Sequence, residues 1–397
     1  MLKIKHFLMN AALFCGVCIL LASGAEAVLR VIGARPPEYV TPEAYGNVNL
    51  LYRPNSNTRW RGNLGMVREF DTPVRTNALT QFDRDRDPAK PEGVYRVLLV
   101  GDSYIEALQV PLEQGMPQLL EDALNRDPDV ASTGKRVEVM KLGGSGNGAL
   151  RAYELLKLRG LEHRPDLVIA FFTDSNDLKD DWHYFRRSTG LEVYEHVNLK
   201  PSTAVYDKLA FYDRLVVLPW SWVNRWAAFA ATQRRERGRQ EAQDAAGWKE
   251  AMGPYALPDA ERFKGDAEKW KEALRLTSVA HMRMRTESVA AGAGYAVAFI
   301  DRQQTYKPEA YRYLYKILPG LDKEVDLDLP VKRLKRFFDG NQVPWIDLNG
   351  IFKERSARGR SGHYAHDGHW NAEGHRWAAE ALAPFVKERL LNELKKN

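Results

Sequence analysis

The sequence predicts an α/β protein with three layers, in which helices cover both faces of a mostly parallel β-sheet. Short apolar runs of strand length alternate along the chain with longer stretches of helical character, and this alternation is typical of βαβ units. Several of the runs are apolar almost throughout, which indicates strands buried on both faces. With 397 residues, the chain is long enough for one large domain or two small ones.

The predicted strands and helices begin at Val94. The expected strands are residues 96–100 (RVLLV), 136–142 (RVEVMKL), 166–172 (DLVIAFF), 295–300 (YAVAFI) and 343–348 (VPWIDL). The expected helices are residues 112–124, 149–158, 271–291, 326–338 and 372–391. Pro117 fits the first turn of its helix, Gly160 can end the second helix, and Pro384 is expected to bend the last one. The α/β domain is therefore placed at residues 94–397.

Between about residues 190 and 270 the alternation of strands and helices lapses. Half of the ten tryptophans belong to this insertion, namely Trp220, Trp222, Trp226, Trp248 and Trp270. Its stretch 209–231 is apolar and aromatic but also carries charged residues. Two interpretations stay open: an aromatic-rich helical pair that packs on the core, or a lid, substrate platform or membrane-resting face.

Residues 1–27 are predicted to be a signal peptide or a signal anchor. Lys3, Lys5 and His6 precede the uncharged stretch 11–22 (AALFCGVCILLA), which is the pattern of a secretory signal. Small residues at Ala25 and Ala27 suit a signal peptidase, whereas the following VLRVIG would extend an uncleaved anchor. Both outcomes place the remaining chain outside the cytoplasm, as a periplasmic, secreted or membrane-anchored protein. Its only cysteines, Cys15 and Cys18, lie in the apolar segment, so no disulfide is expected in the domain.

Residues 28–93 are predicted to form an irregular N-terminal arm, because seven prolines interrupt them and no long periodic run survives. Such a segment could wrap the domain or space it from a membrane. The net charge of +6 is small for this length, and an acidic residue interrupts the basic run 234–239. No zinc-finger or RNA-binding signature accompanies that run, so nucleic acid is not expected as a partner.

The first candidate for chemistry is Ser103 in Gly101-Asp102-Ser103, directly after the strand 96–100. Ligands of parallel sheets gather at the carboxyl ends of the strands, and Ser103 lies at that edge. A serine hydroxyl needs a base, and the base needs an orienting group. A Gly-Asp-Ser triplet alone also makes ordinary turns, so the prediction depends on the motifs that follow.

The next two predicted strands are also followed by motifs at the same edge. Residues 143–148 (GGSGNG) contain four glycines in six positions, more than a tight turn requires, and glycines let backbone N–H groups approach a ligand closely. Residues 173–177 (TDSND) include Asn176, whose NH₂ group can be offered to a developing oxyanion. A helix N-cap is the open alternative for this second motif.

A histidine-rich stretch, residues 363–375 (HYAHDGHWNAEGH), precedes and opens the last predicted helix. His369 with Asp367 two positions before it can form a base and its orienting carboxylate. A polar loop and helix cap that happens to be rich in histidine is the alternative. His366 and His375 are the rival bases, and His375 is expected to pack at the start of the last helix.

Taken in order, GDS, the glycine-rich turn, Asn-Asp and a late Asp and His resemble the SGNH/GDSL hydrolase superfamily. The resemblance covers about residues 94–180 and 295–388, roughly half of the chain, and residues 74–85 (VRTNALTQFDRD) look like the arm of membrane-anchored bacterial members. It implies a flavodoxin-like three-layer fold and a serine esterase that acts on an acylated small molecule or glycan. No cofactor or metal is implied.

The resemblance also assigns roles to individual residues. Ser103 is the expected nucleophile, His369 the general base and Asp367 its orienting group. The expected oxyanion hole combines the Ser103 N–H, the Gly146 N–H and the Asn176 side chain. The family commonly spaces its acid and base as Asp-x-x-His, whereas this chain has Asp-Gly-His, which weakens the assignment of Asp367 more than that of His369.

Three alternatives remain from the sequence. An extracytoplasmic acyltransferase would use the same acyl-enzyme and pass an acetyl group to a glycan instead of water. A metal site could be built from His363, His366, Asp367, His369 and His375, although their spacing matches no zinc motif. A non-catalytic binding protein could retain the same pocket. The favoured substrate is an acyl ester, with O-acetyl groups on a carbohydrate as the specific expectation.

Overall fold

The computed structural model describes residues 2–32, 43–45, 48–51, 54–55, 57–64, 67–174, 176–187, 268–300, 326–365 and 367–395. Apart from its last three residues, the insertion expected at 190–270 lies outside these ranges, as do Ser175 and His366. Trp270 belongs to helix α10 (Glu268–Ala290) and is buried in the core.

Five parallel strands form the central sheet, as the sequence predicted. They are β5 (Val94–Gly101), β6 (Arg136–Gly143), β7 (Leu167–Thr173), β8 (Gly294–Ile300) and β9 (Trp345–Asp347), and their order across the sheet is β6-β5-β7-β8-β9. Within this sheet the order is second, first, third, fourth, fifth, which is the flavodoxin-like order of doubly wound sheets. The chain changes direction across the sheet between β5 and β7, and this switch point is where such folds bind ligands.

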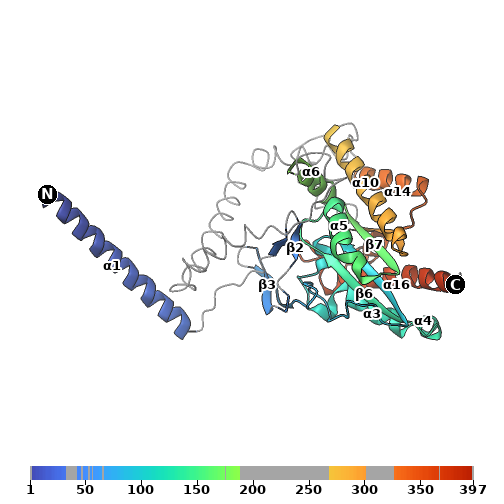
Figure 1. Ribbon diagram of the computed structural model, residues 1–397, viewed down its shortest axis with the longest axis horizontal. Coiled ribbons are helices and arrows are strands. Elements are labelled where there is room, and N and C mark those ends of the chain that lie inside the picture. Colours follow the sequence, from blue (N-terminus) through green and yellow to red (C-terminus); the bar gives the residue numbers. More distant parts are fainter. Residues whose placement is uncertain are drawn as a thin grey trace.

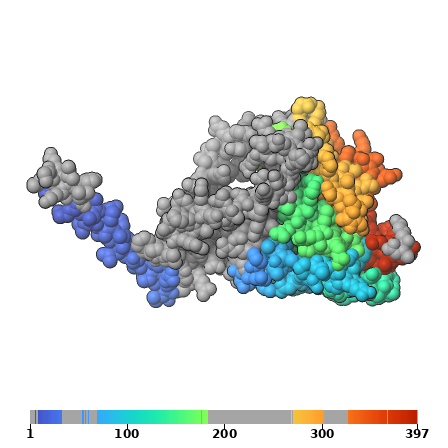
Figure 2. Space-filling view, in the orientation of Figure 1, coloured from blue at the N-terminus to red at the C-terminus, as the bar shows by residue number. Residues whose placement is uncertain are grey.

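Helices cover both faces of the sheet (Figure 1). One face packs against α5 (Ala149–Leu155), α6 (Asp177–Arg187), α10 and α14 (Leu329–Gly340). The other packs against α3 (Met116–Arg126), α15 (Asn349–Ala357) and α16 (Ala372–Leu394). The surfaces of α10 and α14 adjoin in the space-filling view, in agreement with their contacts (Figure 2). The three-layer prediction is therefore confirmed.

Side-chain alternation along the strands divides the core between the two faces. Leu98 and Val100 of β5 belong to the cluster under α5 and α10, whereas Val97 and Leu99 belong to the cluster under α3 and α16. All four are almost fully buried. Each such side chain stabilises the folded chain by about 1.5–3 kcal/mol when it is buried. A strand that is buried on both faces therefore favours apolar residues at every position, and the continuous apolar runs indicated these strands correctly.

The helices depart from the predicted bounds mainly at their ends and in several short segments. A short 3₁₀ turn, η1 (Leu112–Gln114), precedes α3, and Pro117 stands in the first turn of α3. A π turn, η2 (Leu156–Gly160), and a 3₁₀ turn, η3 (Leu161–His163), extend α5. The short helices α2 (Ser103–Glu106) and α4 (Pro128–Ser132) and the helix α15 were not expected from the sequence, whereas α6 begins at Asp177, in the motif for which a helix N-cap was the open alternative.

The N-terminal arm is not irregular throughout, which corrects the expectation for residues 28–93. It contains two antiparallel pairs: β1 (Glu43–Tyr45) with β2 (Val48–Leu51), and β3 (Asn57–Leu64) with β4 (Val67–Arg75). Phe70, Thr72 and Val74 of β4 are buried while their neighbours are more exposed, as in a strand with one solvated face. Pro73 is tolerated because β3 and β4 form a separate two-stranded sheet, in which both strands are edges.

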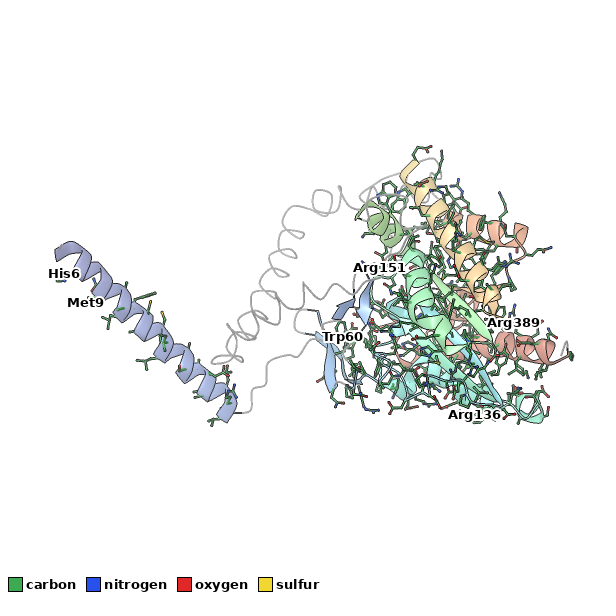
Figure 3. The ribbon with its side chains drawn as sticks, in the orientation of Figure 1. His6, Met9, Trp60, Arg136, Arg151 and Arg389 are labelled. Atoms are coloured by element: carbon green, nitrogen blue, oxygen red, sulfur yellow. The ribbon has the colours of Figure 1, made fainter. Side chains whose placement is uncertain are left out.

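The N-terminal helix α1 (Leu2–Val31) extends beyond the segment 1–27 that the sequence suggested. Its stretch Met9–Val31 has 23 residues, contains an 18-residue window with a mean hydropathy of 2.1, and is long and apolar enough to cross a membrane. Met9, Leu13 and Leu20 are exposed, and Figure 3 shows α1 apart from the α/β body. The helix is thus consistent with a signal peptide or a membrane anchor.

Candidate active site

Ser103 lies at the carboxyl end of β5, where the sheet topology switches. It is the first residue of α2, and Asp102 caps this helix by accepting a hydrogen bond from the Tyr104 N–H at 3.0 Å. Every residue from Val94 to Val110 is buried, so the turn that carries Ser103 is tightly enclosed. Ser103 itself is buried as well, with 8% exposure.

The hydroxyl of Ser103 and the side chains of His369 and Asp367 form one hydrogen-bonded chain. The Ser103 Oγ lies 2.7 Å from His369 Nε2, and His369 Nδ1 lies 2.6 Å from Asp367 Oδ1. A carboxylate can only accept, so Nδ1 carries the imidazole proton and Nε2 accepts from the serine. The structure thus brings together the three residues that the sequence proposed as nucleophile, base and orienting group.

The Asp-Gly-His spacing is compatible with this arrangement because of Gly368. Its φ of +86° lies in the left-handed region, which glycine adopts without strain. The chain therefore turns between Asp367 and His369, and Asp367 Oδ1 also accepts the backbone N–H of His369 at 3.2 Å. The short spacing, which the sequence counted against Asp367, is accommodated by one glycine.

Aromatic side chains and backbone bonds hold the histidine loop, residues 363–371. The Tyr104 ring lies 5.0 Å from the His369 ring, and its hydroxyl donates to the Gly368 carbonyl at 3.3 Å. Tyr364 N–H donates to the His369 carbonyl at 2.9 Å, which closes the loop upon itself. Asn371 then caps α16 by accepting from the Gly374 N–H. His369 is therefore held from both sides of its loop.

The glycine-rich turn after β6 packs directly against the serine turn. A Cβ on Gly143 would lie 2.3 Å from the Glu106 backbone nitrogen, so no other residue fits there without a shift. Gly144 N–H donates to the Gly101 carbonyl at 3.2 Å, and the Ser145 hydroxyl donates to Glu106 Oε2 at 2.6 Å. Gly146 has a φ of +73°. The close approach requires glycine at Gly143, and the positive φ favours it at Gly146.

Asp181 of α6 joins the glycine-rich turn to the segment after β7. Its Oδ1 accepts the Leu150 N–H at 2.9 Å at the start of α5, and a Cβ on Gly148 would lie 2.3 Å from that oxygen. Thr277 of α10 donates to the other oxygen. Burial raises the pKa of Asp181 to about 7. The ends of β6 and β7 are thus linked through a buried carboxyl.

Asn176 follows β7, whose residue Ala170 pairs with Val100 of β5. Its side-chain Nδ2 donates to Asp180 Oδ2 at 2.8 Å, which fixes the orientation of the amide. The adjacent Asp177 is buried, accepts the Thr173 N–H at 2.8 Å, and has a pKa raised well above its usual value by burial. Ser103, Gly146 and Asn176 thus follow three adjacent strands, and their joint role as an oxyanion hole stays a prediction.

Of the two rival bases, His366 lies outside the described residues and His375 serves in packing, as does His363 of the metal-site alternative. His375 is buried, its Nδ1 accepts the Met116 N–H at 3.2 Å, and burial lowers its pKa to about 3. His363 is buried with its ring 5.4 Å from that of Phe352. Within the described ranges, no group of three or more His, Cys, Asp or Glu side chains is arranged to hold a metal ion.

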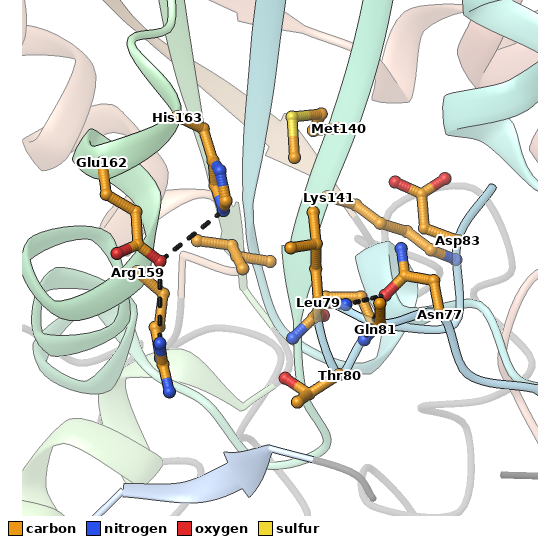
Figure 4. A pocket seen from close by; sticks show the side chains of 12 residues that line it. Asn77, Leu79, Thr80, Gln81, Asp83, Met140, Lys141, Arg159, Glu162 and His163 are labelled. Atoms are coloured by element: carbon orange, nitrogen blue, oxygen red, sulfur yellow. Dashed lines mark hydrogen bonds and ion pairs between the residues drawn. The ribbon is translucent and has the colours of Figure 1, made fainter. Parts of the chain in front are cut away.

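A cavity of about 100 Å³ lies beside β6 (Figure 4). Residues 77–81 and Asp83, residues 140–142 of β6, and Arg159, Glu162 and His163 line it, and none of them belongs to the Ser-His-Asp chain. Lys141 is fully buried at its wall and donates to the Glu106 carbonyl at 2.8 Å. Burial lowers the pKa of Lys141 to about 8, although Asp83 and Glu106 oppose this shift.

Sequence reasoning missed two carboxylates that contact the candidate site. Glu106 accepts from Ser145, as described above, and Glu69 of β4 accepts from the backbone of the histidine loop. The alternation of Phe70, Thr72 and Val74 was a usable signal for the strand that carries Glu69. No sequence pattern connects that strand with a loop almost 300 positions away.

Comparisons with known proteins find related folds among solved structures. An acetyl xylan esterase, AlAXEase, matches with 13% identity and a TM-score of 0.39, over 73% of this chain and 99% of its own. A catalytic mutant of an acetylxylan esterase from Geobacillus stearothermophilus matches with 12% identity and a TM-score of 0.38, over 73% and 93%. A G-D-S-L family structure from Desulfitobacterium hafniense DCB-2 matches with 9% identity and a TM-score of 0.37, over 73% and 98%.

No family model and no curated protein matches the chain. The three structural matches each cover 73% of this chain, at 9–13% identity and with TM-scores of 0.37–0.39. Because identities and TM-scores are low, a functional conclusion depends on the residues of this chain.

Proposed function

We propose that this protein is a serine esterase of the SGNH/GDSL type, with Ser103 as nucleophile, His369 as general base and Asp367 as the group that orients the base. The observation that carries the proposal is the hydrogen-bonded chain Ser103–His369–Asp367 at the carboxyl edge of the parallel sheet. A buried structural serine has no need of an imidazole that is itself oriented by a carboxylate.

The reaction begins when Ser103 Oγ attacks the ester carbonyl carbon and its proton passes to His369 Nε2. The carbonyl oxygen becomes an oxyanion, held by the N–H groups of Ser103 and Gly146 and the amide of Asn176. The C–O bond to the alcohol then breaks, and His369 returns the proton to the departing oxygen. Asp367 keeps the imidazole in the required tautomer and stabilises its charged form.

Water completes the cycle in a hydrolase. It attacks the acyl carbon, gives a proton to His369, and releases the carboxylic acid while Ser103 recovers its proton. A glycan hydroxyl in place of water would make the same chain an acyltransferase. We propose hydrolysis of an acyl ester outside the cytoplasm, with O-acetylated carbohydrates as the substrate class to test first and α1 as the candidate membrane tether.

Labelling of the full chain in detergent with a fluorophosphonate tests the proposal. Ser103 Oγ should displace fluoride from phosphorus, with the serine proton taken by His369, and intact mass should show one adduct. Ser103→Ala should carry no adduct and should lose ester turnover by about 10⁴-fold or more. Ser132→Ala removes an exposed serine hydroxyl on α4 and should label like the wild type.

Two results would overturn the proposal. One is turnover by Ser103→Ala at the wild-type rate. The other is a folded wild-type chain without an adduct, which would favour a binding protein on the same fold. In the active protein, product analysis with and without sugar acceptors distinguishes release of free acid from transfer to a hydroxyl.

A further inference from the structure

Glu69 of β4 clamps the loop that carries the candidate base. Its Oε1 accepts the Ala365 N–H at 2.8 Å, and its Oε2 accepts the Asp367 N–H at 2.7 Å. Both bonds are charge-assisted, and the two oxygens bind two donors of one loop. The Asp367 N–H therefore donates to Glu69, while the Asp367 carboxylate accepts a hydrogen bond from His369 Nδ1.

The strand around Glu69 is itself fixed against both halves of the site. The Phe70 ring lies 5.2 Å from that of Tyr364, in the histidine loop. Thr72 Oγ1 and the Tyr364 hydroxyl both donate to the carbonyl of Gln109, at 3.0 and 3.2 Å. Gln109 follows α2, the helix that Ser103 begins. One strand thus connects the serine segment with the loop of the base.

The same strand is anchored in a small core of its own. Val74 is 1% exposed and packs with Phe82 and Leu108, while Trp60 of β3 lies against this group. Apolar burial therefore holds the backbone of β4 in place, and with it the backbone position of Glu69. A carboxylate on a freely moving arm would lose more conformational entropy in making the same two bonds.

We propose that Glu69 is a positioning residue of the esterase, which acts through Asp367 by holding the backbone of Ala365 and Asp367 so that His369 faces Ser103. This inference rests on the function proposed above. Because these two bonds hold the loop that carries His369, the loss of Glu69 should lower the rate of the chemical step more than substrate binding. Misplacement of a reacting group by about 1 Å can cost about 100-fold in rate.

The experiment compares Glu69→Ala and Glu69→Gln with Asp85→Asn in the full chain. Asp85 pairs with Arg75 at the exposed end of β4, so its variant removes a nearby carboxylate that does not touch the loop. We expect Glu69→Ala to lower the fluorophosphonate labelling rate and kcat about 10- to 100-fold with little change in KM. Glu69→Gln keeps the shape and one acceptor, and should lie between Glu69→Ala and the wild type.

Two further readouts separate positioning from general loss of stability. The melting temperature of Glu69→Ala should remain within a few degrees of that of Asp85→Asn. Hydrogen exchange should accelerate at the amides of Ala365 and Asp367 and not in β5 or β7. The inference would be overturned if Glu69→Ala had the same labelling rate and kcat as Asp85→Asn. It would also be overturned if the loss of kcat came with a clearly lower melting temperature and faster exchange throughout the sheet.

Failure of the proposed function gives a different pattern. A folded wild type that no fluorophosphonate labels overturns the esterase proposal and, with it, the catalytic part of this inference. Exchange at Ala365 and Asp367 then decides the structural part alone: acceleration in Glu69→Ala supports the clamp, and unchanged exchange overturns it.

Discussion

The turn that carries Ser103 and the loop that carries His369 are held in different ways. The serine turn is buried along its whole length and contacts the glycine-rich turn of the neighbouring strand through backbone groups. The side chains of His369 and Asp367 retain 27% and 22% exposure, and a carboxylate nearly 300 positions away holds their loop. The proposed nucleophile is therefore held by the sheet, whereas the loop of the proposed base is held by β4.

This difference predicts where the site is sensitive to change. Around Ser103, close backbone approach at Gly143 makes substitution costly for the fold itself. Around His369, the side chains of Asp367 and His369 are partly exposed, so their substitution should disturb the sheet less. Activity should thus be separable from stability at the loop and inseparable from it at the glycine-rich turn.

The largest expected effect comes from removing the base. His369→Ala should lower kcat by about 10⁴-fold or more, because Ser103 then has no acceptor for its proton. Because the His369 side chain is partly exposed, its removal should leave the melting temperature nearly unchanged. Ester turnover and a melting curve on the same sample check this prediction, and a stable variant with wild-type kcat would break the comparison.

A smaller effect is expected from one oxyanion donor. Asn176→Ala should reduce kcat by about 10²–10³-fold, because one of the three proposed donors is lost while nucleophile and base remain. Asn341→Ala, which removes an amide at the end of α14, is the matched control and should keep wild-type kcat. Steady-state kinetics that show equal rates for the two variants would contradict the role of Asn176.

The smallest effect on activity is expected at His375. His375→Ala leaves the Met116 N–H without its acceptor and creates a cavity, so the free energy of unfolding should fall by about 2–4 kcal/mol with kcat unchanged. Urea denaturation and ester turnover measure the two quantities. A dead variant of normal stability would make His375 the base and would contradict the assignment to His369.

His375 also predicts a pH dependence of stability. Burial holds its pKa at about 3 in the folded chain, below the ordinary value of 6.5, so the unfolded chain binds the proton more readily. The stability that neutral His375 contributes is fully present above pH 6.5 and is lost as the pH falls toward 3. His375→Ala should show a shallower loss over this window, and His281, whose pKa is also lowered to about 3, should account for part of what remains.

Much of the sheet was predictable because its strands are buried on both faces. Runs such as RVLLV and YAVAFI leave few alternatives, and all five predicted strands overlap with the observed ones. The strands β3 and β4 were missed because Arg59, Arg61, Glu69 and Asp71 give them a polar appearance and prolines were interpreted as breaks. Their alternation carried the strand signal, since only one face of β4 is buried.

The candidate site was predictable in residue type and only partly in geometry. Motifs that follow successive parallel strands must meet at one edge, so Ser103, Gly146 and Asn176 could be placed together. The prediction that His369 contacts Ser103 depended on the resemblance to a known family, because the two residues lie 266 positions apart in the sequence. The proposed role of Glu69 could not be predicted from the sequence, since it depends on how a separate two-stranded sheet packs against a loop that is distant in the sequence.

The separation of 266 positions between Ser103 and His369 has a consequence during synthesis. At about 5–20 residues per second, a ribosome needs roughly 13 to 53 seconds to extend the chain from the nucleophile to the base. Throughout that interval the nascent polypeptide carries Ser103 without its proposed proton acceptor. A chain that stops before His369 would lack that base even when all five strands of the sheet are complete, so we expect a prematurely ended product to carry no activated serine.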